Sequence, residues 1–156
     1  MRIMDFLNKK AIKAELQSKD KKGVIEELVD LLVTSGVVKK NDKNAIIGTL
    51  MDREELGSTG IGQGIGIPHG KHPSIKQLVA SFGLSRSGVD FDSLDGEPVK
   101  IFFLLMAAEE SAGPHLKALA RISRLLKDKY FRDMLINAKD EKDIIRIIDS
   151  EDQRRQ

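Results

Sequence analysis

The sequence predicts an α/β fold, a three-layer α/β/α sandwich with a mixed central sheet, formed by a single domain over residues 1–156. Apolar stripes at helical spacing come before, between and after short strand-like runs, as in helices that cover a sheet. Residues 99–107 are apolar almost throughout, which is typical of a central strand covered on both faces. A chain of 156 residues with 40% hydrophobic residues is long enough to bury one sizeable core.

The first third of the chain predicts one strand and two helices. Alternating apolar residues, capping residues and a glycine stop define them. The expected elements are a strand over 12–16, a helix from its cap Ser18 to about Ser35 with a stop at Gly36, and a helix from its cap Asp42 to near Gly57.

The second half predicts two strands and three helices. The strands are expected over 78–85 and 99–107, with a turn at Asp95-Gly96 between them. Pro114 suits the first position of a helix, since its missing N–H would have no partner there. Two short helices are expected from about Asp128 and about Asp140.

Residues 58–70 are the most informative segment. Glycines alternate with larger residues from Gly60 to Gly66, which is strand spacing and would place four glycines on one face. Such a strand is weak, because glycine loses much conformational freedom and packs nothing. We therefore expect neighbouring structure to approach this backbone closely. The run ends at His69, held between Pro68 and Gly70 on a stiff support.

Composition excludes several classes of function. The net charge is +2, from 26 basic and 24 acidic residues, so neither nucleic acid nor a membrane surface is expected as a partner. No cysteine is present, which excludes disulfides and thiol chemistry. The N-terminus lacks the features of a signal peptide, and the longest apolar run is too short to span a membrane. A cytoplasmic protein is expected.

The sequence contains three histidines, His69, His72 and His115, and three interpretations compete for them. His69 could be a turn residue without chemistry, and this is the favoured interpretation for His72, which precedes Pro73. His69 and His72 could instead begin a zinc site, although Lys71 would lie beside the cation and the segment is not helical. The third interpretation is that His69 accepts a phosphoryl group, which needs neither metal nor cysteine.

Two other residues favour phosphoryl chemistry. His115 follows Pro114 in the first turn of a helix, where unpaired N–H groups and the helix dipole favour anions. Arg53 precedes the glycine segment and could offer a planar guanidinium, although a solvated charge at a helix end has the same spacing. The glycines do not fit the dinucleotide or P-loop patterns. Ile65 stands where the P-loop and a dinucleotide pattern from Gly60 need glycine, and Ile67 stands where a dinucleotide pattern from Gly62 needs it. No ATP, other cofactor or metal is expected.

Several motifs closely resemble the IIA domains of the bacterial phosphoenolpyruvate-dependent sugar phosphotransferase system, of the mannitol/fructose type that includes the nitrogen-regulatory IIA proteins. The resemblance spans nearly the whole chain. The motifs are Arg53-Glu54, Gly57-Ser58-Thr59-Gly60-Ile61-Gly62, Gly66-Ile67-Pro68-His69-Gly70, Phe91-Asp92, Asp95-Gly96-Glu97-Pro98-Val99 and His115-Leu116-Lys117-Ala118-Leu119-Ala120. Gly66 departs from the alanine that many members carry.

The resemblance implies a phosphocarrier with the same α/β/α sandwich. His69 would take a phosphoryl group from the histidine phosphocarrier protein HPr and pass it to a IIB component. His115 would hydrogen-bond the phosphoryl group and Arg53 would stabilise its charge. The main interpretation is a fructose- or mannitol-type transport component. The alternative is a nitrogen-regulatory protein whose His69 phosphorylation state controls partner binding, and a zinc hydrolase is a third hypothesis. The sugar itself and the residues of the docking surface cannot be assigned from the sequence.

Overall fold

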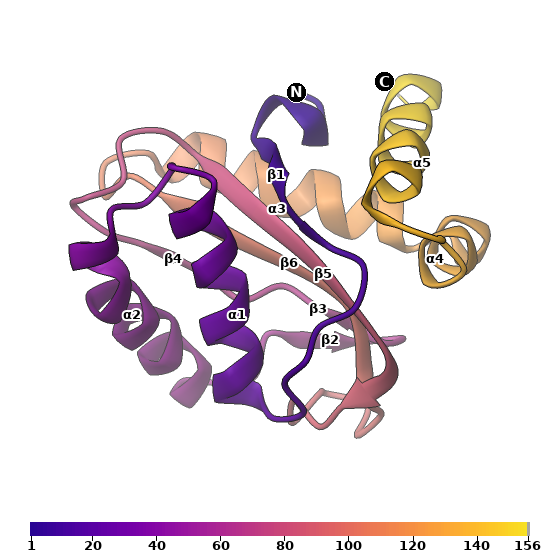
Figure 1. Cartoon of the computed structure of the whole chain (residues 1–156), viewed down its shortest axis with the longest axis horizontal. Helices are drawn as coiled ribbons and strands as arrows, with labels where there is room; N and C mark the ends of the chain where they lie inside the picture. Colours follow the sequence, from indigo (N-terminus) through magenta and orange to yellow (C-terminus); the bar gives the residue numbers. More distant parts are fainter. Residues whose placement is uncertain (156) are drawn as a thin grey trace.

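The structure is a computed structural model that describes residues 1–155. A six-stranded mixed sheet, in the order β1-β5-β6-β3-β2 with β4 also paired to β6, lies between two helical layers (Figure 1). The strands are β1 (Leu7–Lys13), β2 (Gly60–Gly62), β3 (Ile65–Gly66), β4 (His69–Lys71), β5 (Val79–Val89) and β6 (Val99–Ala107). The helices are α1 (Lys21–Thr34), α2 (Lys43–Glu55), α3 (Ala112–Leu126), α4 (Lys129–Ile136) and α5 (Glu141–Arg154). The predicted three-layer sandwich is confirmed.

Strand β6 is the centre of the sheet. It runs antiparallel to β5 and parallel to β3 and β4. Alternate side chains enter two separate cores, one with α1 and α2 and the other with α3, α4 and α5. Ile101, Phe103 and Leu105 enter the second core, whereas Phe102, Leu104 and Met106 enter the first. Residues 99–107 are apolar almost throughout because both faces of this strand are buried. The predicted central strand is confirmed.

Several element boundaries differ from the sequence prediction. The first strand lies earlier than expected, because β1 pairs with β5 from Leu7 onward. Helix α1 is capped by Asp20, whose Oδ1 accepts a hydrogen bond from the Gly23 N–H at 2.7 Å, and the predicted cap Ser18 instead donates its N–H to Glu27. Gly36 does follow the helix with φ +83°, a conformation that glycine adopts readily.

The later helices also agree with the sequence prediction only in part. Helix α3 begins at Ala112, so Pro114 is its third residue and not its first. Helices α4 and α5 begin directly after Asp128 and Asp140, close to the predicted starts, and each of these side chains caps its helix by accepting a backbone N–H. Helix α5 has 14 residues and is longer than expected.

The glycine segment is not one extended strand. β2 and β3 pair antiparallel, with Gly62 opposite Ile65, and the two residues between them have φ values of +58° at Gln63 and +77° at Gly64. Positive φ at both central residues is what the type I′ hairpin turn requires. The predicted close approach does occur at Gly66, where an added Cβ would lie 3.1 Å from Val99 Cγ1.

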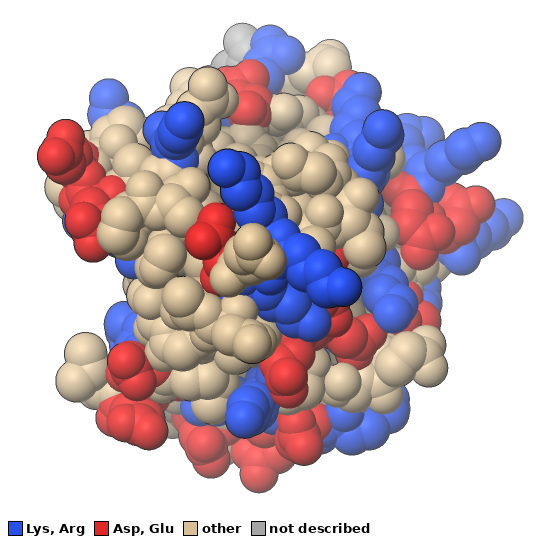
Figure 2. Space-filling view, turned by 60° about the vertical axis from the view of Figure 1, so that its left-hand side comes forward, with Lys and Arg blue, Asp and Glu red and all other residues tan. Residues whose placement is uncertain are grey.

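Figure 2 turns the α2 side of the molecule forward. Basic and acidic side chains are interspersed across this face, and a large uncharged area fills much of its left half. Along residues 1–155, no helix is long and apolar enough to cross a membrane.

Candidate active site around two histidines

The backbone around His69 is tied to the sheet on both sides. In β4, His69 lies opposite Leu105 of β6, and the Leu105 N–H donates to the carbonyl of Pro68 at 2.9 Å. The Ile67 N–H donates to the carbonyl of Thr59 at 3.0 Å. The sheet therefore fixes the position of the imidazole through its own main chain.

A hydrogen bond determines which nitrogen of His69 can react. Nδ1 lies 2.7 Å from the carbonyl oxygen of Ile67. A carbonyl can only accept, so Nδ1 carries the proton and the neutral ring presents its lone pair on Nε2. Burial lowers the pKa of His69 below 6.5 and the charge of Arg53 lowers it further, while the Ile67 hydrogen bond and Glu54 oppose these effects. The neutral, nucleophilic form is therefore favoured near pH 7.

His115 faces His69 from the first turn of α3. The ring centroids lie 5.4 Å apart with the planes at 73°, and the His115 side chain is buried. Within residues 1–155, its Nε2 is buried and has no hydrogen-bond partner. Burial, followed by the charges of His69 and Lys71, lowers the pKa of His115 to about 4. The site thus holds a neutral second imidazole with one ring nitrogen uncommitted.

Arg53 completes the cluster from the last turn of α2. Its Nη1 donates to the carbonyl of Gly57 at 2.8 Å, so part of the guanidinium is committed to the end of the helix. Arg53, His69 and His115 line one open hollow of about 600 Å³. The structure therefore brings together all three residues that the sequence singled out. Leu56 lies in the same hollow with 86% of its surface exposed.

Sequence reasoning missed Glu54 as a residue of interest. Its side chain is only 2% exposed, and its carboxylate accepts hydrogen bonds from both the N–H and the hydroxyl of Thr59. The Nζ of Lys21 lies 3.2 Å from the same carboxylate. In the charged run 52–55 the sequence singles out only Arg53 as a candidate, and a solvated helix end is the competing interpretation. The glutamate in the Arg53-Glu54 motif was the available signal.

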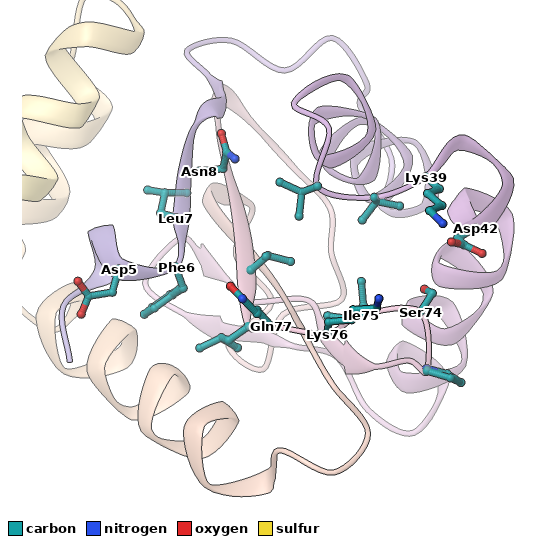
Figure 3. A pocket seen from close by; sticks show the side chains of 15 residues that line it. Asp5, Phe6, Leu7, Asn8, Lys39, Asp42, Ser74, Ile75, Lys76 and Gln77 are labelled. Carbon is teal, nitrogen blue, oxygen red and sulfur yellow. The ribbon is translucent and has the colours of Figure 1, made fainter.

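A larger cavity lies elsewhere and contains none of the three predicted residues (Figure 3). It measures about 740 Å³ and is formed by the start of β1, the connection between α1 and α2, and the loop between β4 and β5. His72 belongs to that same loop, where its Nδ1 lies 2.7 Å from the hydroxyl oxygen of Ser74. His72 does not line the hollow of His69.

Comparison with known proteins identifies the family. Residues 5–151 match the family described as "Phosphoenolpyruvate-dependent sugar phosphotransferase system, EIIA 2". The fructose-specific EIIABC component of Bacillus subtilis is 42% identical over 152 residues, which are 97% of this chain but only 24% of that protein. A nitrogen regulatory protein of Bradyrhizobium diazoefficiens is 36% identical over 95% of both chains.

Solved structures agree with the sequence comparison. The nitrogen regulatory protein IIA-Ntr of Neisseria meningitidis superposes with a TM-score of 0.83 at 32% identity, covering 92% of this chain and 97% of that one. The mannitol IIA of Escherichia coli, solved with phosphorylated mannitol IIB, shares the fold with a TM-score of 0.75 at 17% identity, over 90% of this chain and 95% of that one. The chain therefore belongs to the EIIA type 2 family of the phosphoenolpyruvate-dependent sugar phosphotransferase system, whose domains are phosphotransferase components that carry phosphohistidine.

Proposed function

We propose that Nε2 of His69 is the phosphoacceptor of this chain. The observation that carries the proposal is the hydrogen bond from Nδ1 to the Ile67 carbonyl, which leaves the Nε2 lone pair as the nucleophile. The lowered pKa of His69 keeps that lone pair free near pH 7. The open hollow in front of the ring gives a donor protein access.

In the proposed transfer, the Nε2 lone pair of His69 attacks the phosphorus of a phosphohistidine on the donor. The new P–N bond forms as the donor's P–N bond breaks, and the donor ring recovers its lone pair. The proton on Nδ1 of His69 stays in place, so the phosphorylated ring gains positive charge. The Ile67 carbonyl 2.7 Å away stabilises that charge. The reverse sequence delivers the group to the next carrier.

His115 and Arg53 are proposed to stabilise the phosphoryl oxygens. The uncommitted Nε2 of His115 can donate to an oxygen once it carries the ring proton, and the nearby dianion would favour that form. The remaining donors of the Arg53 guanidinium can pair with another oxygen. Each charge-assisted hydrogen bond is worth about 1.5–3 kcal/mol, which is enough to hold the group without trapping it.

The proposed donor is phosphorylated HPr or its nitrogen-branch equivalent, and the proposed acceptor is a IIB component. EIIA domains of this family work with HPr and IIB components. Two exposed apolar side chains at the site support an apolar docking face. Leu56 lines the hollow, and Leu116, next to His115, is 67% exposed. A transient phosphoryl-transfer complex needs only a modest interface.

We assign the chain to fructose- or mannitol-type sugar uptake, in keeping with its 42% identity to the fructose-specific component of Bacillus subtilis. The second candidate is nitrogen regulation, in which the phosphorylation state of His69 selects partners. It is favoured by the Neisseria meningitidis IIA-Ntr structure and the Bradyrhizobium diazoefficiens protein, whose whole lengths this chain nearly matches.

The test is reconstitution with phosphoenolpyruvate and the upstream phosphotransferase components, followed by mapping of an acid-labile phosphohistidine. We expect the label on His69 and its rapid passage to a fructose-type IIB protein. Labelling at another residue would contradict the site assignment. Labelling at His69 without passage to fructose- or mannitol-type IIB proteins would favour the regulatory candidate.

A further inference from the structure

A buried carboxylate, that of Glu54, accepts hydrogen bonds from Thr59, near the segment that carries His69. Glu54 lies in the last turn of α2, and its carboxylate receives the Thr59 N–H at 3.1 Å, the Thr59 hydroxyl and the Lys21 ammonium at 3.2 Å. A carboxylate this deeply buried is costly unless its lone pairs are satisfied, and here three donors converge on it. Thr59, in turn, has both of its donors held by one side chain.

Thr59 connects this carboxylate to His69. The carbonyl of Thr59 accepts the Ile67 N–H at 3.0 Å, and the carbonyl of Ile67 accepts the His69 Nδ1–H at 2.7 Å. The chain of hydrogen bonds therefore runs from Glu54 through Thr59 and Ile67 to the imidazole. Each step holds the residue that makes the next contact.

Lys21 connects Glu54 to a second carboxylate that lies outside this chain of hydrogen bonds. The Lys21 ammonium lies between Glu54 and Asp92, 3.4 Å from Asp92 Oδ2, and 4.8 Å from the centroid of the Phe91 ring. Asp92 thus shares Lys21 with Glu54, whereas the two donors of Thr59 are held by Glu54. The Thr59 hydroxyl, which donates to Oε2 of Glu54, can be tested separately from the Lys21 ammonium, which lies beside Oε1.

We propose that Glu54, acting through Thr59 and Ile67, is a positioning residue that keeps His69 in the tautomer with the proton on Nδ1. If Thr59 is released, the Ile67 carbonyl loses its fixed position, and the His69 ring is free to exchange its proton between the two nitrogens. The fraction of rings with a lone pair on Nε2 then falls. The consequence for phosphoryl transfer rests on the proposed function, whereas the consequence for the tautomer does not.

Three variants separate this role from packing. Thr59→Val keeps the shape and removes the hydroxyl, Glu54→Gln keeps the size and removes the charge, and Thr59→Ser restores a hydroxyl. Asp92→Asn is the matched control, because it changes the other partner of Lys21. Asp92 has φ +54°, which asparagine also tolerates.

The readouts are the ¹⁵N chemical shifts of the His69 ring in the unphosphorylated protein and the rate of phosphoryl acceptance from phosphorylated HPr. We expect wild type, Thr59→Ser and Asp92→Asn to show one Nδ1-protonated tautomer. We expect Thr59→Val and Glu54→Gln to show mixed tautomers and about a tenfold slower acceptance. The loss of a hydrogen-bond partner that orients a metal-binding histidine has an effect of about this size.

Thermal unfolding is measured on every variant. If Thr59→Val and Glu54→Gln lose only stability and keep the wild-type ¹⁵N shifts, the role is structural and the positioning proposal is wrong. If Asp92→Asn matches Thr59→Val, Lys21 and not Thr59 is responsible, and the proposal is again wrong. If the tautomer changes as expected but wild-type His69 is never phosphorylated, the positioning role stands and the proposed function fails.

Discussion

Two hollows of the molecule, one around His69 and one beside the start of β1, differ in chemistry more than in size. The larger one, about 740 Å³, is lined by the start of β1 and the loop after β4, and the smaller, about 600 Å³, surrounds His69. Among residues 1–155, buried side-chain atoms without partners occur at Ser85, Ser93, His115 and Arg121. None of these four lines the larger hollow, whereas His115 lines the smaller. Convergent and unsatisfied polar groups therefore distinguish the candidate site, and volume does not.

The largest expected effect is at the nucleophile. His69→Ala should abolish phosphoryl acceptance, since no other ring in the hollow presents a nitrogen fixed in the same way. Labelling by phosphorylated HPr measures it. The control is Lys76→Ala in the larger hollow, which should be labelled within twofold of the wild-type rate. Normal labelling of His69→Ala would refute the assignment of the site. Loss of labelling in Lys76→Ala would show that the larger hollow, too, is needed for phosphoryl acceptance.

The second effect is at the facing imidazole. His115→Ala should still accept the group but pass it to a IIB protein about a hundredfold more slowly, as expected when a donor to developing charge is removed. Single-turnover transfer kinetics measure this. A wild-type transfer rate in His115→Ala would remove the proposed role of His115.

The third effect concerns pH and stability. The pKa of His115 is about 4 in the folded protein and near 6.5 in an exposed imidazole. Between these values the unfolded chain binds the proton and the folded one does not, so the unfolding free energy falls as the pH drops from about 6.5 to about 4. We expect a loss of about 1–3 kcal/mol from this residue. Urea unfolding at several pH values measures it.

His115→Gln supplies the comparison for that pH series. The variant should lose less stability than wild type over the same range, since it lacks the titrating group. Parallel curves for the two proteins would show that the pKa of His115 is not depressed. Other groups that titrate in this range cancel in the difference.

The smallest expected effect is at Arg53. Arg53→Ala should slow acceptance and onward transfer by about tenfold each, which corresponds to one charge-assisted hydrogen bond. Arg124→Ala, an exposed arginine of α3 outside the hollow, is the control. Unchanged kinetics in Arg53→Ala would leave its bond to the Gly57 carbonyl as its whole role.

The sequence predicts the layers and singles out three residues that the structure brings together, because strong local signals mark the central strand and His69. An apolar run such as 99–107 can satisfy its burial only inside a two-faced core, and His69 is held between Pro68 and Gly70. The hairpin was missed because glycine fits an extended strand and a tight turn equally well. Alternation alone could not show that Gln63 and Gly64 adopt positive φ.

The supporting role of Glu54 was hidden for a different reason. Its carboxylate is buried by Lys21 and Thr59, and their proximity depends on how α1 and β2 pack against the end of α2. Apart from the Arg53-Glu54 motif, no local pattern distinguishes this buried glutamate from the exposed Glu55 beside it.

The uncommitted Nε2 of His115 has a thermodynamic consequence for a phosphocarrier. A phosphoryl group on His69 would supply that nitrogen with a partner in the native state and would offer nothing comparable to the unfolded chain. Covalent loading would then act on folding as a tightly bound ligand does, raising the melting temperature and slowing amide exchange in the first turn of α3. Calorimetry alone could then follow how much of a sample is loaded.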